Sequence, residues 1–527
     1  MNKYLRCYRD FSGGLSEVAN DNMADNQLHA ARNIIPGEGA GIARAFGTEQ
    51  AFPQLPSNFP AESFIEYKPA SSATQLLAVV RVAENAVSIY RLNAAGNAWL
   101  AVSGAQGLPP LLDWFITGGK LFWLDGSAFR CYDGSSAQLA NISIDGSFMI
   151  APGDVAGNAL MAKIDSAIAV ERRGQRWFFA TPDNEIIFSN VGQAADFSLT
   201  NIININSGFE DNITALYEFA EGLLIFQRRD IYFLSGWDFA DGTDIRLSRL
   251  NVSCGTTWPK TVRRMENVVI YLGSNGVYRL YLPQAAYMPA AENISEGKIS
   301  LALVQDGDIA EAHAEVWDNA YFLSVRGVNT GSKRREYRFY PRHKAFFGPY
   351  TQEAQAYALH NNQLLLLAKN GFLLRYSKDS RHYIDTQSGG NVGIPIYAET
   401  KAFDVAGAFA QNVRLDKALF ICAKNEGGTA PLYLGIKCDA MGREYAVNLT
   451  DINAAPDWGQ NHPPVDMGQS GTMTKEILVR RPAKRVSFTL SGSGAEQALL
   501  VYGLGMVYKR RKVNGKRAGI NRVLEQG

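Results

Sequence analysis

The sequence predicts an all-β protein. We expect a β-propeller of about six blades, with five to seven compatible with the spacing, and an additional β-sandwich-like domain formed by the C-terminal region and the N-terminal segment. Six times between residues 119 and 380, a short apolar run meets a tight polar or glycine turn and leaves as a second apolar run. The copies recur every 45 to 55 residues. Hairpins at this spacing cannot bury their own apolar faces, and radial stacking into a propeller solves that problem.

Each copy has the composition of a β-hairpin. Aromatic and β-branched residues favour the pleated surface, and turns such as Asp125-Gly126 and Asn275-Gly276 supply the backbone angles of a reversal. The copies start at Gly119, Gly174, Gly222, Asn267, Asn319 and Asn362. Glycine (49 residues) and aromatic residues (11%) also favour β structure with many turns.

The segments outside the repeat define the other expected domains. Residues 1–50 should be an N-terminal arm with a short helix over 25–33, capped by Asp25. Strands near 64–67, 75–82, 87–92 and 99–102 should open the propeller, which spans 51–388. Residues 389–508 change character and predict a β-sandwich platform, with a long polar loop at 453–471 of the kind used in binding or assembly. Residues 509–527 form a basic C-terminal arm.

Composition limits the function classes. Five scattered cysteines without a C-x-x-C pair argue against a disulfide framework or a zinc site. We expect no cofactor. The start lacks an apolar signal segment and no run is long enough to span a membrane, so we expect synthesis and folding in a cytoplasm. The net charge of +1 argues against a dedicated nucleic-acid binder.

No catalytic or metal-binding constellation stands out. The six histidines never lie two or four residues apart, as a metal pair on one strand or helix would require. Asp183, Asn184 and Glu185 occupy a hairpin turn, and the Ser143-Ile-Asp145-Gly146 phrase has the pattern of another turn. We therefore expect a protein that is not an enzyme.

The basic C-terminal region is the candidate assembly interface. The residues chosen are Arg480, Arg481, Lys509, Arg510, Arg511 and Lys512. Three interpretations stay open: a solvated end, an arm that docks on an acidic neighbouring subunit, or contact with passing DNA. The third is the weakest, because many lysine and arginine contacts to phosphate would slow the passage of DNA.

Several phrases resemble phage tail structural proteins. They are YRDFSGGL at 8–15, DNQLHAARNI at 25–34, GIARAFGT at 41–48, IIFSNVGQAADFS at 186–198, VSCGTTWPKTVRRMENVVIYLGSNGVYRL at 252–280 and the stretch 485–512. Each phrase is loose, and their order carries the resemblance. One departure is Ala45, where a second basic or polar residue is common in the family.

The resemblance is to tail-hub or tail-nozzle proteins of short-tailed bacteriophages. It implies a structural virion protein in the tail that is synthesised and assembled in the host bacterial cytoplasm and forms a homo-oligomeric ring, usually of six copies in the family. Such a ring contacts portal or adaptor proteins on one side and needle, spike or fibre proteins on the other. It contributes to the genome-delivery channel, so genomic DNA passes through it during ejection.

An alternative from another class stays open. The propeller could belong to a glycan-binding protein or a polysaccharide-degrading enzyme that acts on the host surface, with exposed Trp and Tyr rings stacking on sugars. Against it, aromatic residues such as Trp123, Trp177 and Tyr271 alternate inside the hairpins, as core residues do.

Overall fold

The fold was derived from a computed structural model. It describes residues 3–510 except for 38–39, 57–59, 71–72, 147–153, 206–210, 237–244, 253, 285, 306, 332, 381, 406–412, 424–431, 440–446, 449–471 and 493–499. The chain forms two compact units. One contains residues 46–346 and 350–392, and the other contains 1–45, 347–349 and 393–527.

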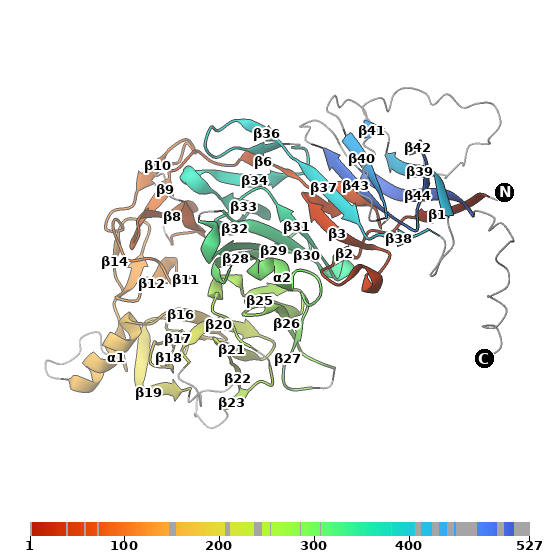
Figure 1. Cartoon of the computed structure of the whole chain (residues 1–527). Helices are drawn as coiled ribbons and strands as arrows, with labels where there is room; N and C mark the ends of the chain where they lie inside the picture. The colour runs from red at the N-terminus through yellow and green to blue at the C-terminus, as the bar shows by residue number, and fades with distance from the viewer. Residues whose placement is uncertain are drawn as a thin grey trace, which may run out of the picture. The chain divides into compact units, whose positions relative to one another are not determined.

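The first unit is a β-propeller whose described residues form seven blades, and Figure 1 shows them following one another round the ring in chain order. Blade 1 contains β7 (Ala61–Tyr67), β8 (Gln75–Ala83), β9 (Ala86–Leu92) and β10 (Trp99–Ala101). Blade 2 contains β11 (Asp113–Thr117), β12 (Lys120–Leu124), β13 (Phe129–Tyr132) and β14 (Ala137–Leu139). Blade 3 contains β15 (Ser143–Ile144), β16 (Ala169–Arg173), β17 (Arg176–Ala180), β18 (Glu185–Ser189) and β19 (Asp196–Asn204), with helix α1 (Val155–Asp165) between β15 and β16.

The remaining blades repeat the pattern. Blade 4 contains β20 (Ile213–Phe219), β21 (Gly222–Gln227), β22 (Ile231–Ser235) and β23 (Arg246–Arg249). Blade 5 contains β24 (Arg263–Met265), β25 (Val268–Gly273), β26 (Gly276–Tyr281) and β27 (Ala290–Asn293), and helix α2 (Ser300–Val304) follows it. Blade 6 contains β28 (Ile309–Trp317), β29 (Ala320–Gly327), β30 (Arg335–Tyr340) and β31 (Ala345–Tyr350). Blade 7 contains β32 (Ala356–His360), β33 (Gln363–Leu367), β34 (Leu373–Ser377) and β6 (Gly47–Gln50).

Each of the six predicted hairpins is the central strand pair of a blade, from β12–β13 to β33–β34. The count of six is one short. Residues 61–101, expected only to open the ring, form a complete four-stranded blade. The propeller also begins at Phe46 rather than at residue 51, because β6 belongs to it.

Strand β6 closes the ring. It pairs antiparallel with β34, so Thr48 lies opposite Tyr376, although more than 300 residues separate them in the sequence. Thr48 is fully buried, and its hydroxyl donates to Gln352 at 3.1 Å and accepts from the backbone N–H of Ile384 at 3.1 Å. Apolar side chains of blades 7 and 1 also share one core. The propeller is therefore a closed circle.

Buried polar side chains join neighbouring blades. The Tyr67 hydroxyl of blade 1 donates to the carbonyl of Gly119 at 2.6 Å, before β12 of blade 2. Arg173 of blade 3 donates to the carbonyl of Gly222 of blade 4 at 2.9 Å. Tyr321 of blade 6 donates to the carbonyl of Thr261, before blade 5, at 2.8 Å. A buried donor needs an acceptor, so these bonds fix how adjacent blades meet.

The second unit is a β-sandwich of two sheets. Sheet A has the order β4 (Ile34–Pro36), β5 (Ile42–Arg44), β44 (Leu500–Arg510), β39 (Val413–Ala423) and β42 (Thr472–Pro482), and β1 (Lys3–Tyr8) also pairs with β44. Sheet B has the order β2 (Gly14–Leu15), β3 (Gln27–Arg32), β37 (Ile396–Thr400), β43 (Arg485–Gly492), β40 (Leu432–Cys438) and β41 (Val447–Asn448), and β38 (Phe403–Asp404) also pairs with β43.

Outside both sheets, β35 (His382–Ile384) pairs with β36 (Asn391–Gly393). The 3-10 turns include η1 (Asn20–Asn22), η3 (Pro259–Thr261), η4 (Val328–Thr330), η5 (Pro341–His343) and η6 (Lys369–Gly371).

Two expectations for the N-terminal segment are wrong. Residues 27–32 form strand β3, not a helix. A β-bulge between Leu28 and Ala30 places the buried Leu28 and Ala31 three residues apart, which is the spacing of a helical face. Asp25 caps no helix and instead forms an ion pair with Lys401 at 2.7 Å.

The described parts of the two chain ends are not free arms. Strand β1 pairs with β44 of the same chain, with Leu5 opposite Val507. Both ends are therefore built into sheet A. The long loop expected at 453–471 and the arm beyond Arg510 lie outside the described residues.

Candidate functional sites

The predicted interface residues gather at one end of sheet A. In the register of this sheet, Arg414 lies opposite both Lys509 and Pro482, and Arg481 lies one pair further along, opposite Leu415. Those described are Arg480, Arg481 and Lys509, together with Arg510 as a backbone position opposite Val413. Arg511 and Lys512 lie outside the described residues.

The carboxylate of Asp416 lies at this basic end of sheet A. Asp416 accepts an ion pair from Lys509 at 2.9 Å and lies 3.6 Å from Arg414. Arg480 is exposed and has a φ of 50°, near the C-terminal end of strand β42. The arrangement leaves a positively charged surface suited to an acidic partner.

The outward face of sheet A carries a row with exposed apolar side chains. Leu5, Val507, Lys417 and Leu478 lie directly opposite one another on four adjacent strands. Leu5 is 58% exposed and Leu478 is 60% exposed. The neighbouring row points into the sandwich and is buried, as seen at Met506, Ala418 and Ile477. Strand β42, which carries Leu478, ends the described order of the sheet, so the row runs to a sheet edge.

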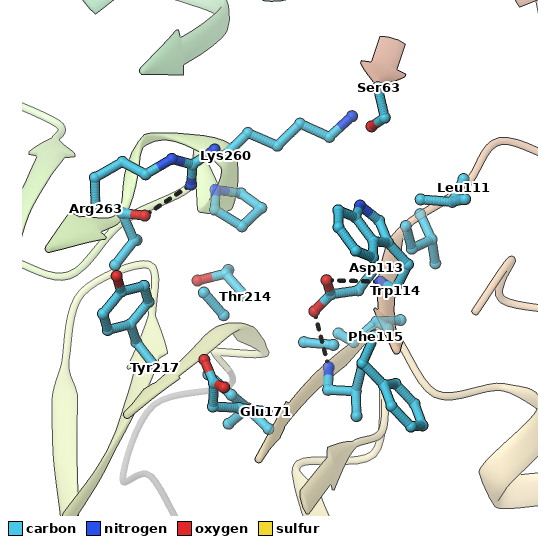
Figure 2. Close-up of a pocket in the computed structure, with 18 of the residues that line it drawn as sticks. Ser63, Leu111, Asp113, Trp114, Phe115, Glu171, Thr214, Tyr217, Lys260 and Arg263 are labelled. Atoms are coloured by element: carbon cyan, nitrogen blue, oxygen red, sulfur yellow. Dashed lines mark hydrogen bonds between the residues drawn. The ribbon is translucent and has the colours of Figure 1, made fainter. Parts of the chain in front are cut away.

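The propeller has a cavity of about 300 Å³ in its channel, lined by the innermost strands of several blades. Figure 2 shows Asp113, Glu171, Thr214, Tyr217, Lys260 and Arg263 around it. The Asp113 carboxylate accepts the backbone N–H of Val170 at 2.9 Å and of Trp114 at 2.9 Å, so it bridges blades 2 and 3. Burial raises the pKa of Asp113 to about 6.

Glu171 lies on the next inner strand. Burial raises its pKa to about 7, and the nearby charge of Asp113 adds to this rise. Each carboxyl therefore holds its proton to a higher pH than a solvated one. Two carboxyl groups whose pKa values lie near neutral pH share this cavity, and such groups can donate and accept protons.

Positive charges occupy the opposite wall. Arg263 forms an ion pair with Glu315 at 3.1 Å. Lys260 extends across the cavity toward Ser63 (Figure 2), and burial lowers its pKa. His313 is neutral, because burial and nearby cations hold its pKa well below the usual range.

These channel residues were not predicted from the sequence. A signal for several of them exists: Asp113, Glu171 and Arg263 lie on the first strand of their blades, which a propeller places innermost.

The residues that the sequence assigned to turns have structural roles. Asn184 has a φ of 60° in the turn before β18, and Glu185 forms an ion pair with Lys163 at 2.6 Å. The Ser143 hydroxyl donates to Asp196. All five cysteines are free thiols. Within the described parts of the chain, no three His, Cys, Asp or Glu side chains are grouped as a metal site requires.

Comparisons with known proteins name no family. No family model matches the chain, and no curated protein matches it. Among solved structures, the extracellular domain of a hybrid two-component system from B. thetaiotaomicron is 8% identical, with a TM-score of 0.43 over 81% of this chain and 58% of that chain. The computationally designed protein Ika8 is 12% identical, with a TM-score of 0.34 over 62% of this chain and 99% of that one.

A further solved structure, an exo-beta-1,3-galactanase from Phanerochaete chrysosporium bound to beta-1,3-galactotriose, is 11% identical, with a TM-score of 0.29 over 77% of this chain and 98% of that one. Scores this low give no basis for transferring a function. No described helix has the length and apolar character needed to cross a bilayer.

Proposed function

We propose that this chain is a structural subunit that assembles with copies of itself into a ring, as a tail hub or nozzle protein of a short-tailed phage does. The resemblance of the sequence phrases suggests the family. The single observation that carries the proposal is the outward row of sheet A, with Leu5 and Leu478 more than half exposed. Exposed apolar side chains in line on one sheet, beside a long edge strand, are typical of a surface that another chain covers.

The occupant we propose is a second copy of this chain. A ring needs a heterologous interface, in which one face of each subunit meets a different face of the next. The basic end of sheet A supplies charge at the margin of the same sheet. Residues 506–527 carry a net charge of +6 within a chain of net charge +1, so residues 1–505 carry −5 and supply a complement. Permanent interfaces typically bury about 2,000 Å² or more, so the row would be the centre of a larger contact.

The test is the mass of the assembled protein. Light scattering of the full chain should show a particle of several hundred kilodaltons, against 57.8 kDa for one copy. Leu478→Glu should reduce it toward the monomer, because a charge would be buried in the interface. Leu139→Glu is the matched control, since Leu139 is 62% exposed on blade 2 and should leave the mass unchanged.

Two results would contradict the proposal. One is a monomer at every concentration, alone and with the other tail components. The other is an assembly that Leu478→Glu leaves intact.

The alternative function, a propeller that binds or degrades polysaccharide, has one observation in its favour. Asp113 and Glu171 are two partly buried carboxyls with raised pKa values in one cavity. The hydrogen bonds of Asp113 to two backbone N–H groups also give it a structural role. Turnover of a polysaccharide that Glu171→Gln abolishes would favour this alternative.

A further inference from the structure

A second, larger cavity opens at the end of the propeller where the innermost strands begin. It has a volume of about 790 Å³, within the range of small-molecule sites. Residues of blades 1, 6 and 7 and the segment before blade 5 line it. It shares Glu62, Pro259, Lys260 and His313 with the channel cavity, so the two meet at Lys260.

The lining has more positive than negative charge. Its cations are Arg81, Lys260, Arg326, Arg334 and Lys369, and its carboxylates are Glu62, Glu84 and Glu311. Glu353, outside the lining, pairs with Lys369 at 2.6 Å, so one positive charge remains in excess. His313 adds no charge, because its pKa lies well below the usual range. The excess of cations attracts an anion into a partly enclosed space, where charge is poorly screened.

The carboxylates are largely engaged. Arg81 donates to Glu62 at 2.6 Å, and Glu311 is shared by Arg326, at 2.8 Å, and Arg334. Lys260 differs from these cations, because it makes no hydrogen bond or ion pair with any residue that the structure describes. Its three donors are available to a ligand.

Two further donors in the wall are also unsatisfied. Arg334 Nε donates to Gln355 Oε1 at 2.9 Å, which fixes the orientation of the amide, since a flip would place NH₂ against N–H. Arg334 Nη1 and Gln355 Nε2 are then left buried without a partner among the described residues. The Arg334 side chain is only 3% exposed. Such a donor excess is costly unless an acceptor enters or a small shift exposes the donors to one.

We propose that this cavity binds a sugar-sized molecule that carries an oxyanion, a carboxylate or a phosphate, with the oxyanion at Lys260. The apolar parts of the wall, Trp258, Pro60 and Pro259, offer a surface for a ring, and the Nε2 of Gln355, which lacks a partner, suits a hydroxyl group. The site lies within the propeller and is independent of the proposed assembly function.

The experiment is calorimetric titration of the full chain with glucuronate, glucose 6-phosphate, glucose and inorganic phosphate. Glucuronate, glucose 6-phosphate or both should bind, and glucose should bind at least tenfold more weakly. The stronger of the two acidic sugars identifies the oxyanion. Lys260→Met should weaken binding at least tenfold, and Lys260→Arg should retain most of it, because it keeps the charge. Lys120→Met, at an exposed lysine outside the lining, is the matched control and should bind as the unmodified chain does.

Three results would overturn the proposal. The first is that glucose binds as tightly as the acidic sugars, which would remove the role of the oxyanion. The second is that neither acidic sugar binds at millimolar concentration. The third is that only inorganic phosphate binds, and that it binds equally well to the Lys260→Met and Lys120→Met variants, which would identify an adventitious ion only. Circular dichroism of each variant separates loss of binding from loss of fold.

Discussion

A buried ion pair between blades 6 and 7 allows a quantitative test of how the propeller is held together. Glu336 is 1% exposed and Arg338 is fully buried on the same strand, β30. Arg338 Nε donates to Glu336 at 2.8 Å. The hydroxyls of Tyr357 and Tyr376, both on blade 7, also donate to Glu336, at 2.7 Å each.

Aromatic rings enclose the guanidinium of Arg338. Its central carbon lies 3.8 Å from the ring centre of Tyr350, 4.5 Å from that of Tyr376 and 4.6 Å from that of Phe322. Removal of one charge leaves the other buried and uncompensated, which costs about 3–5 kcal/mol. We therefore expect Arg338→Met and Glu336→Gln each to destabilise the propeller by about that amount.

The double variant, which combines Glu336→Gln with Arg338→Met, is the decisive comparison. With both charges gone, the new amide can still accept from the two tyrosines, and the new thioether side chain can pack among the rings. The double variant should then lose less stability than either single variant. Guanidinium unfolding followed by tryptophan fluorescence suits the measurement, since the Trp317 ring stacks on Tyr376 at 6.3 Å.

A surface pair provides the control. Arg279 and Glu292 form an ion pair with side chains 36% and 49% exposed, and Arg279→Met should cost less than about 1 kcal/mol. Our account of the interface between blades 6 and 7 fails if the single variants at Glu336 and Arg338 stay within about 1 kcal/mol of the unmodified chain. It also fails if the double variant loses the sum of both.

Three further predictions concern ring closure, pH and close packing. Thr48→Val removes two hydrogen bonds at the junction of β6 and β34 and should cost about 1–3 kcal/mol, with faster amide exchange in β34; unchanged exchange would contradict the closure argument. The folded state holds protons on Asp113 and Glu171 up to pH about 6 and about 7, whereas the unfolded chain releases them near pH 4, so the contribution of these two groups to stability should fall as pH rises from 4 to 7. The melting temperatures of Asp113→Asn and Glu171→Gln should therefore rise relative to that of the unmodified chain over this window, and a difference that does not change with pH would refute the assignment. Gly255→Ala would place a Cβ 1.9 Å from the carbonyl oxygen of Gln227, so it should lower the melting temperature clearly, and a fully stable variant would show that the loop can shift.

The sequence predicted local elements well, because their causes are local. Hairpins follow from alternating apolar residues and from turn residues such as Asn275-Gly276, which lie next to each other in the chain. The helix at 25–33 failed because a bulge, which pairing with β37 reveals, gives a strand the spacing of a helix.

Features that depend on pairing between distant parts of the chain could not be predicted from the sequence. The closure of the ring joins Thr48 to Tyr376, and no local pattern shows that residues so far apart become neighbours. Blade 1 differs from this case, because its four strands pair in chain order, so its omission from the count of six does not come from distant pairing. The raised pKa values of Asp113 and Glu171 arise from burial in a channel that seven blades build together. The gathering of Arg480, Arg481 and Lys509 depends on the register of β39 with two partners.

Sheet A is built from strands that lie before the propeller in the sequence and strands that lie after it, and this bears on how the protein folds during synthesis. Strands β1, β4 and β5 leave the ribosome before the propeller, yet β44, the partner of β1 and β5, is the last described strand to be synthesised. During translation the backbone groups of these early segments bond to water until the whole propeller has emerged and β44 follows. A product that ends before residue 500 would keep all the described strands of its blades but never complete the sandwich, so only chains that contain β44 would present the assembly surface proposed above.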